Sequence, residues 1–161
     1  MELKFRVQAK IKKPVSEVFD AIYNPKKLST YFTTGGASGP LEEGRTVEWS
    51  FADTGEHVRF PVKVTRVVRN KLIQFQWEAS EGHYDPKSGK MPEGAGYDTT
   101  VELSFEPLSK DETLVTITEG TWRPTEKGLQ GSYGNCAGWM NMYCCLKAYL
   151  EHGINLRKDS F

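Results

Sequence analysis

Two charged side chains fall on the apolar phase of predicted strands, and they have the clearest chemical potential in this sequence. Glu119 follows Val115 and Ile117 at intervals of two residues, and Arg66 follows Val64 in the same way. Residues at this spacing share one face of a strand. A buried carboxylate must be paired or protonated. One hypothesis is therefore that Glu119 and Arg66 pair at the edge of an internal cavity and orient the polar end of a ligand.

A simpler explanation is available for both residues. They can lie at strand ends, or a bulge near Thr65 can turn Arg66 outward. The adjacent apolar residues Val67 and Val68 favour the bulge, because strict alternation would place one of them in solvent. Strand boundaries inferred from sequence are imprecise by a few residues, so we favour the simpler explanation over the pairing.

Other reactive residue types show no catalytic spacing. His57, His83 and His152 are scattered, and His83 with Asp85 offers at most two metal ligands. We find neither a Ser-His-Asp or Cys-His order nor a glycine-rich phosphate loop after a strand. The sequence thus predicts no catalytic residue, no metal site and no cofactor, and it favours a binding protein over an enzyme.

Aromatic residues make up 12% of the chain, enough to fill a core or to line a ligand cavity. For a single residue the core is the simpler interpretation. For the set a cavity is favoured, because buried Trp N–H and Tyr O–H groups need partners. The residues predicted to line this cavity are Trp49, Phe60, Phe75, Trp77, Tyr97, Glu119, Cys136, Trp139, Met140 and Tyr143, with Arg66 as polar partner.

The bulk composition limits the partners. The 161 residues hold 21 basic and 21 acidic side chains, which gives no electrostatic footprint for nucleic acid or an anionic membrane. The start MELKFRVQAK alternates like a strand and does not resemble a secretory signal. Cys136, Cys144 and Cys145 are an odd number of thiols in one predicted helix, which favours buried free cysteines in a reducing cytoplasm. We expect a cytoplasmic protein of one domain, residues 1–161.

A long helix over residues 126–151 must position most of these side chains. Leu129, Ser132, Cys136, Trp139, Tyr143, Leu146 and Leu150 recur at steps of three and four, which forms one apolar stripe. Gly153 stands where a left-handed cap is expected. Four glycines between Gly128 and Gly138 weaken the first half, because each costs about 1 kcal/mol relative to Ala. We therefore expect the second half to be the anchor and the first half to be the entrance to the cavity.

The rest of the chain predicts a sheet. Alternating patterns over residues 2–12, 47–51, 58–66, 73–79, 97–105 and 113–121 indicate strands, and a further short strand is compatible with the loop near Ala37. Two short helices, from Pro14 to Ile22 and over 26–32, follow the first strand. The connection 80–96 contains four glycines and two prolines and can be either a binding lid or a mobile hairpin tip.

Three segments resemble a known family. Residues 13–21 (KPVSEVFDA) are similar to its P-x-E-x-V-W/F-x-A helix start, and residues 24–32 (NPKKLSTYF) to its d-P-e-k-L-x-x-W-F segment, with Tyr31 where Trp is usual. Residues 138–150 (GWMNMYCCLKAYL) resemble its G-W-x-x-x-L-x-x-L-x-x-Y-L helix, with Tyr143 where Leu is usual. The family is the one related to the C-terminal domain of the activator of Hsp90 ATPase, in the START/Bet v 1-like (SRPBCC) superfamily.

This resemblance implies an α+β helix-grip fold: a curved antiparallel sheet of six or seven strands around a long C-terminal helix, with two short helices after strand 1. It also implies a hydrophobic cavity between sheet and helix that binds an apolar or amphipathic small molecule. Two alternatives remain: a co-chaperone-like interaction module with a chaperone as partner, and a cyclase- or hydrolase-type enzyme using Glu119 as acid/base. The motifs are packing motifs, so they specify the fold more closely than the function.

Overall fold

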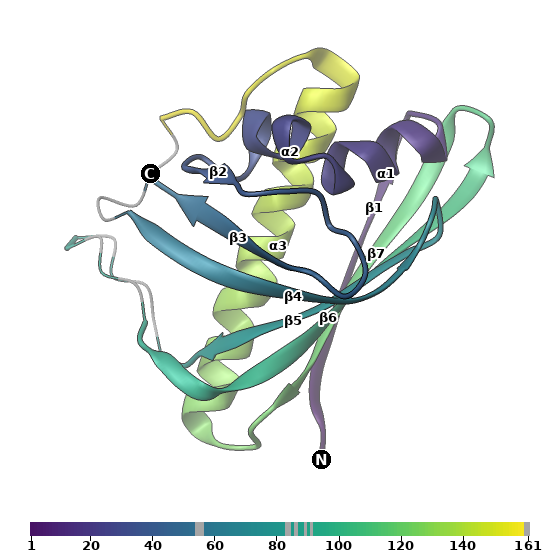
Figure 1. Cartoon of the computed structure of the whole chain (residues 1–161). Coiled ribbons are helices and arrows are strands. Elements are labelled where there is room, and N and C mark those ends of the chain that lie inside the picture. The colour runs from purple at the N-terminus through teal and green to yellow at the C-terminus, as the bar shows by residue number, and fades with distance from the viewer. Residues whose placement is uncertain (54–56, 83–84, 86, 89, 91, 160–161) are drawn as a thin grey trace.

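The part of the chain that the structure describes forms one curved sheet, two short helices and one long helix (Figure 1). In this computed structural model, the described residues are 1–53, 57–82, 85, 87–88, 90 and 92–159. The elements in chain order are β1 (Leu3–Ile11), α1 (Val15–Tyr23), α2 (Pro25–Tyr31), β2 (Gly36–Ala37), β3 (Thr46–Phe51), β4 (Val58–Val68), β5 (Leu72–Ser80), β6 (Gly94–Ser109), β7 (Glu112–Trp122) and α3 (Glu126–His152).

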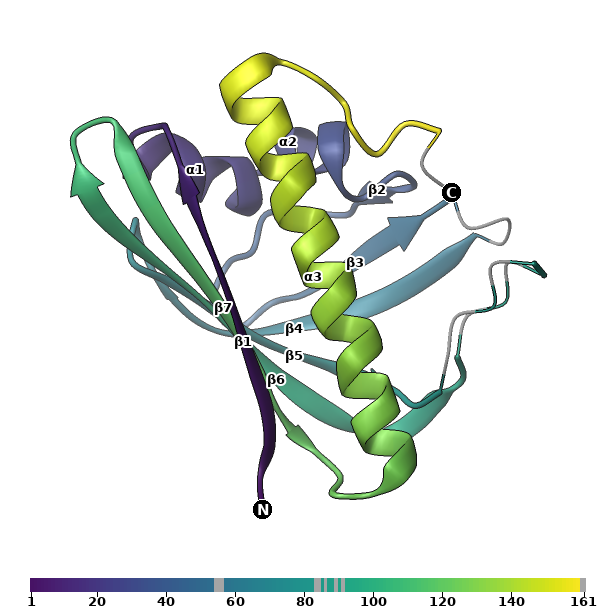
Figure 2. The same ribbon diagram turned by 180° about the vertical axis from the view of Figure 1, so that it is seen from behind.

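The seven strands form one antiparallel sheet in the order β1-β7-β6-β5-β4-β3-β2. The sheet bends around α3, which crosses its concave side along the whole height of the molecule (Figures 1 and 2). Helices α1 and α2 lie near the C-terminal end of α3 and cover one end of the curved sheet (Figure 2). The predicted helix-grip architecture is confirmed, including the short strand at Ala37.

Helix α3 has defined caps at both ends. The Thr125 hydroxyl accepts from the Gly128 N–H at 3.1 Å, and Gly153 is in the left-handed conformation with φ 66°. The predicted stripe faces inward, with Ser132, Trp139, Tyr143 and Leu146 buried. The apolar spacing therefore overrides the low helix propensity of the four glycines.

The second half of α3 is fastened to the edge strand β1. The Tyr143 hydroxyl lies 2.7 Å from the carbonyl of Val115 and 3.2 Å from that of Val7. Lys147 donates to the Lys10 carbonyl at 2.9 Å, and Glu151 accepts from the Lys12 N–H at 2.6 Å. These side chains bond to backbone groups of β1, of its neighbour β7 and of Lys12, the residue after β1. They make this half of the helix the expected anchor.

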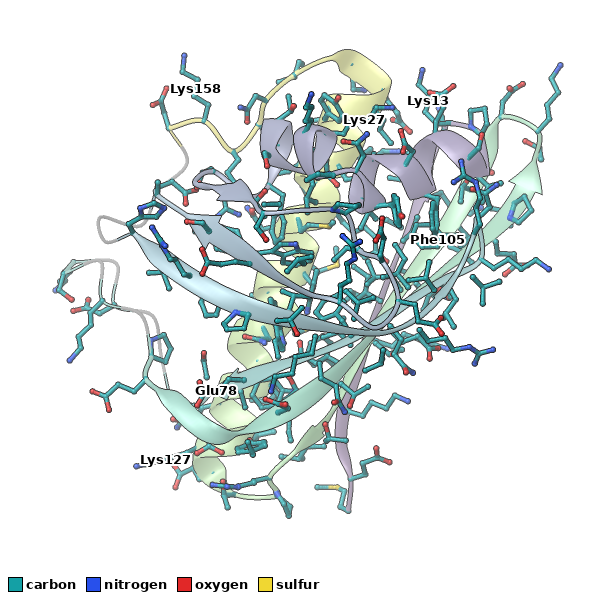
Figure 3. All side chains as sticks on the ribbon, viewed as in Figure 1. Lys13, Lys27, Glu78, Phe105, Lys127 and Lys158 are labelled. Carbon is teal, nitrogen blue, oxygen red and sulfur yellow. The ribbon has the colours of Figure 1, made fainter. Side chains whose placement is uncertain are left out.

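One hydrophobic core fills the space between the concave face of the sheet, helices α1 and α2, and the second half of α3. Phe105 is buried there against Phe19, whereas the labelled Lys13, Lys27 and Lys158 point outward (Figure 3). The Asn24 side chain caps α2 by accepting from the Lys26 N–H at 3.0 Å. Among the described residues, no helix is long and apolar enough to cross a membrane.

Two details differ from expectation. The connection between β5 and β6 is shorter than predicted, because β5 extends to Ser80 and β6 starts at Gly94; Asp85 and Lys90 form an isolated bridge within it. Several of its residues, including His83, lie outside the described part. Cys144 is exposed, which corrects the expectation of three buried thiols, because it is off the apolar stripe; Cys145 is buried and Cys136 half-buried.

Candidate ligand-binding pocket

Glu119 is fully buried and accepts hydrogen bonds from four side chains. Its Oε1 accepts from Trp77 Nε1 at 3.0 Å, Thr99 Oγ1 at 2.6 Å and Asn135 Nδ2 at 3.0 Å. Its Oε2 accepts from Trp139 Nε1 at 2.8 Å and Asn135 Nδ2 at 3.2 Å. Both carboxylate oxygens are therefore engaged by the protein itself.

Three neighbouring strands and one turn of α3 bring this group together. Trp77 pairs with Thr99 across β5 and β6, and Glu119 pairs with Val101 across β6 and β7, so Trp77, Thr99 and Glu119 lie close together on the concave face. Asn135 and Trp139 are four residues apart on α3 and share a face of the helix. The inward phase of Glu119 along β7, predicted from Val115 and Ile117, is confirmed.

Burial raises the pKa of the Glu119 carboxyl, and the donors from Thr99, Trp77, Trp139 and Asn135 offset this only in part. No Lys, Arg or His in the described residues forms an ion pair with it. The charge is instead solvated by neutral donors. Such hydrogen bonds are about twice as strong as those between neutral groups, so the four donor side chains are held in place.

A pocket of about 520 Å³ lies on the other side of Trp77, Asn135 and Trp139 from the carboxylate. Its walls come from the ends of α2, β3, β4 and β5, from the first half of α3 and from the C-terminal segment. The lining residues are Phe32, Phe51, Val58, Phe60, Trp77, Glu78, Ser80, Gly82, Pro92, Gly131, Gly134, Asn135, Ala137, Gly138, Trp139, Asn141 and Arg157. The volume falls within the range of small-molecule sites.

Aromatic rings form the apolar surface of this pocket. Trp77 and Trp139 stack with centroids 5.4 Å apart, and Phe60 contacts Trp77 at 6.0 Å. Phe32 packs against both Trp139 at 6.2 Å and Phe51 at 5.2 Å. The backbone of α3 approaches β1 and β7 most closely, so these large rings bridge the wider gap toward β3, β4 and β5.

Glycines of α3 leave room in the pocket. A Cβ atom at Gly134 or Gly138 would meet no atom within 4 Å, whereas one at Gly131 would lie 2.5 Å from the Ser80 carbonyl oxygen. Gly131 is therefore required for close packing of α3 on the end of β5. Gly134 and Gly138 instead border open space, in the half of the helix where the entrance to the cavity is predicted.

An ion pair joins the C-terminal segment to one end of the pocket. The Arg157 guanidinium donates to both oxygens of Asp53, at 2.5 and 3.2 Å, and lies over the rings of Phe32 and Phe51 at 5.3 and 5.0 Å. Burial would raise the pKa of Asp53, but the bonds from Arg157 and Thr34 outweigh it and lower the pKa. The cation that borders the pocket is thus paired with an anion.

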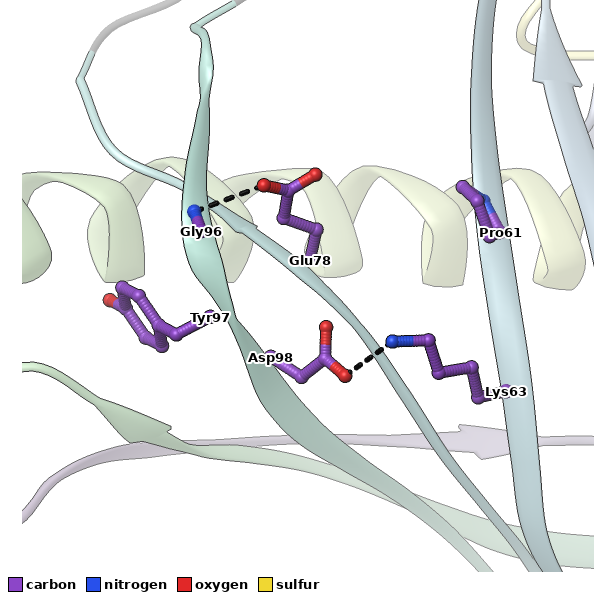
Figure 4. A pocket seen from close by; sticks show the side chains of 6 residues that line it. All are labelled: Pro61, Lys63, Glu78, Gly96, Tyr97 and Asp98. Atoms are coloured by element: carbon purple, nitrogen blue, oxygen red, sulfur yellow. Dashed lines mark hydrogen bonds and ion pairs between the residues drawn. The ribbon is translucent and has the colours of Figure 1, made fainter.

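A second depression, of about 380 Å³, lies on the outer face of the sheet (Figure 4). Lys63 pairs with Asp98 at 2.6 Å across it, and Glu78 accepts from the Gly96 N–H at 3.0 Å. Its polar groups bond to one another. It therefore offers a ligand little apolar surface, in contrast to the pocket beside α3.

The residues predicted to line the cavity separate into three groups. Phe60, Trp77 and Trp139 line the pocket, with Glu119 directly behind the two indoles. Trp49, Phe75, Cys136 and Tyr143 are packed in or against the core and are absent from the lining, because neighbouring rings or strand backbone cover them. Met140 and Tyr97 lie elsewhere.

Met140 and Tyr97 do not line the pocket, contrary to the prediction. Met140 is 41% exposed, because one helical step from Trp139 turns its side chain off the apolar stripe. Tyr97 lies at the irregular start of β6, next to Gly96 with φ 72°. Its hydroxyl donates to Glu81 at 2.9 Å and its ring lies under Arg123, so it borders the outer depression instead.

The hypothesis that Arg66 pairs with Glu119 is wrong. The register of β4 against β5 shifts between Val64 and Arg66, and this irregularity turns Arg66 into solvent. The alternative explanation, a bulge near Thr65, is the correct one. The partners of Glu119 are indole, hydroxyl and amide groups, which no parity argument could identify.

Sequence reasoning missed Phe32, Phe51 and Arg157 as pocket residues. Phe51 shares the phase of Val47 and Trp49 along β3, and Phe32 directly follows α2, so in sequence both resemble ordinary core residues. Arg157 follows the cap at Gly153, and only the return of the chain toward Asp53 brings it to the pocket. A cation after a helix cap indicates no particular contact in sequence alone.

Ser50 and His57 also meet unexpectedly, through Ser50 Oγ and His57 Nε2. Ser50 lies between Trp49 and Phe51 on β3. A Cβ atom at Gly35 would collide with Ser50 Oγ and with His57 Nε2. Neither residue belongs to the lining of the pocket beside α3. This hydroxyl–imidazole contact joins β3 to the residue that precedes β4, beside Gly35, the residue before β2.

The sequence profile described as "Activator of Hsp90 ATPase homolog 1-like protein" matches residues 12–151. The chain belongs to this family. The match covers most of the chain, including α1, α2, the whole sheet from β2 to β7 and nearly all of α3. No curated protein was found to match the sequence.

Solved structures agree in fold with this family member. Protein SSP2350 from Staphylococcus saprophyticus is 24% identical, with 96% of each chain covered and a TM-score of 0.72. The Aha1 dimer from Colwellia psychrerythraea is 22% identical, covering 94% of this chain and 98% of the other, with a TM-score of 0.67. DynU16, described as a putative protein in the dynemicin biosynthetic locus, is 22% identical over 94% of this chain and 48% of its own, with a TM-score of 0.72. At these identities the likeness concerns the fold alone.

Proposed function

We propose that this protein binds an apolar or amphipathic small molecule in the pocket between β4, β5 and the first half of α3. The observation that carries the proposal is the pocket of about 520 Å³ with five aromatic side chains in its lining. Aromatic rings with a few fixed polar groups are typical of small-molecule sites. The location of DynU16 in a biosynthetic locus is compatible with a small-molecule ligand for this fold.

The role of Glu119 in this proposal is to position the wall. Both of its oxygens accept bonds from protein groups, and it lies behind the lining residues Trp77, Asn135 and Trp139. A general acid or base must reach the reacting atoms of a substrate. Its surroundings therefore favour a structural role over the acid/base role of an enzyme.

Interaction with a chaperone is the second hypothesis for this chain. It is supported by the description of the family and by the name of its structural relative from Colwellia psychrerythraea, Aha1. No described surface feature adds to that support, so small-molecule binding is the function that the site favours.

The test is ligand binding by the purified chain and by a variant with a filled pocket. Gly138→Leu places a side chain in the open space of the pocket, and Cys144→Leu adds a similar side chain at an exposed helix position outside it. A library of apolar small molecules is screened by thermal shift, and the extracted protein is analysed by native mass spectrometry. Stabilisation of the wild type and of Cys144→Leu, but not of Gly138→Leu, supports the proposal.

Two outcomes contradict it. If no compound stabilises the wild type and none is co-purified, the binding function is wrong. If Gly138→Leu binds the same compounds with unchanged affinity, the ligand lies elsewhere on the molecule.

A further inference from the structure

The amide of Asn135 has a fixed direction in the wall of the pocket. Asn135 is half-buried on α3 and belongs to the pocket lining. Its Nδ2 lies 3.0 Å from Glu119 Oε1 and 3.2 Å from Glu119 Oε2. The NH₂ group of the amide thus faces the carboxylate behind the wall.

The neighbours of Glu119 enforce this direction. Indole N–H groups donate only, and Trp77 and Trp139 donate to different oxygens of Glu119. Both oxygens must consequently act as acceptors, so the group of Asn135 that faces them is the NH₂ group. The carbonyl Oδ1 is at the other end of the planar amide, and in the described part of the chain no hydrogen-bond donor reaches it.

The second asparagine of the lining is different. Asn141 Oδ1 is 3.6 Å from Cys145 Sγ, within its own helix, so its carbonyl already has a donor. The pocket therefore combines aromatic walls with one acceptor whose direction is set from behind.

We propose that the pocket selects ligands that carry a hydrogen-bond donor, a hydroxyl or N–H group, on an aromatic body, and that Asn135 Oδ1 accepts this bond. The inference rests on the proposed function and specifies its ligand class. A site with a directed polar group discriminates against analogues that cannot hydrogen-bond to it. Binding such an analogue removes the polar group from water and gives it no hydrogen bond in return.

The charges around the pocket extend the inference to the charge of the ligand. Glu119 lies behind the wall and Glu78 borders the pocket, while the Arg157 cation is paired with Asp53. Acidic side chains near the pocket, Glu78, Glu119 and Asp53, outnumber the one basic side chain in its lining, Arg157, and a carboxylate ligand would also face the Asn135 carbonyl. The selected class is therefore neutral or cationic donors, and anions are disfavoured.

The test uses three probes that share one ring system: 2-naphthol, 2-methoxynaphthalene and 2-naphthoate. The methoxy compound keeps the oxygen but lacks its hydrogen, and the naphthoate is anionic. Affinities are measured by calorimetry or by quenching of tryptophan fluorescence. For the wild type we expect 2-naphthol to bind about tenfold more tightly than 2-methoxynaphthalene, with 2-naphthoate weakest.

Two variants locate the effect. Asn135→Leu should bring 2-naphthol and 2-methoxynaphthalene within about twofold of each other while the methoxy compound still binds. Asn141→Leu is the matched control, with the same change on the same helix and in the same pocket, and should retain the preference for the donor.

The outcomes separate this inference from the proposed function. Equal wild-type affinity for 2-naphthol and 2-methoxynaphthalene overturns the inference but leaves the binding pocket in place. Absence of binding by all three probes counts against both. The wild-type comparison needs no variant, so it decides the matter even if Asn135→Leu does not fold.

Discussion

The stacked rings of Trp77 and Trp139, 5.4 Å apart, donate their N–H groups to opposite oxygens of the same carboxylate. This is not a general property of the tryptophans in this fold. The buried indole N–H groups of Trp49 and Trp122 have no partner among the described residues. Trp77 and Trp139, whose indole N–H groups are hydrogen-bonded, form the pocket wall. The buried carboxyl group of Glu119 therefore contributes to the shape of the site.

Glu119→Gln should destabilise the protein. A glutamine places an NH₂ group where a carboxylate oxygen accepted from a donor-only indole, so at least one buried hydrogen bond is lost. We expect a loss of about 1–3 kcal/mol in the free energy of unfolding, measured by urea denaturation. Glu106→Gln, an exposed position on β6, is the control and should change stability by less than about 0.5 kcal/mol. Equal stability of both variants would contradict the role given to Glu119.

The stability contribution of Glu119 should depend on pH. Because burial raises its pKa in the folded state, the folded protein holds this proton more tightly than the unfolded chain does. Stability from this group is therefore greatest below the ordinary carboxyl pKa, about 4.3, and decreases as pH rises through the raised value. The measurement is the difference in unfolding free energy between wild type and Glu119→Gln as a function of pH, in which other groups cancel. A difference that grows with pH would mean that the four donors outweigh burial.

Alanine substitutions at two glycines of α3 should have opposite effects. Gly134→Ala meets no atom within 4 Å and should stabilise the helix by about 0.5–1 kcal/mol. Gly131→Ala collides with the Ser80 carbonyl at 2.5 Å and with Trp122 at 3.0 Å, and should destabilise by about 1–3 kcal/mol. Thermal denaturation distinguishes the two. If both substitutions changed the stability in the same direction, the contrast between open space at Gly134 and close packing at Gly131 would be contradicted.

Arg157→Ala should loosen the C-terminal segment. It leaves the mostly buried Asp53 without its bidentate partner, and we expect a cost of about 2 kcal/mol near neutral pH. Because the pKa of Asp53 is lowered, its contribution is present above the ordinary aspartate pKa, about 3.9, and is lost as pH falls through the lowered value. The wild type should therefore lose its advantage over Arg157→Ala in acid, as urea titrations at several pH values can show. Lys158→Ala, at the exposed neighbouring position, should behave like the wild type throughout.

The two halves of α3 should differ in hydrogen exchange. Residues 139–150 include Tyr143 and Lys147, which bond to the backbone of β1, whereas residues 128–138 border the pocket and contain four glycines. Amides in the first half should exchange faster, since fewer buried contacts resist local opening. Equally slow exchange in both halves would contradict an entrance there.

The sequence predicts this fold well because its signals are periodic. Alternation identified the inward face of β7, and steps of three and four identified the buried stripe of α3. The site depended on other information. The bulge between Val64 and Arg66 reverses the face of one side chain, and the partners of Glu119 come from β5, β6 and α3, which only the curvature of the sheet brings together. Patterns within an element thus predicted burial, while contacts between elements could not be predicted.

Gly134 and Gly138 also have a consequence for how such proteins can diverge. Both positions border the pocket, and neither is needed for the packing of α3 on the sheet. A lineage could therefore change the size of its binding site by one substitution on this helix, while the half fastened to β1 preserves the fold. Ligand preference and structural integrity are in this way separated along a single helix, so relatives with one architecture can acquire different ligands.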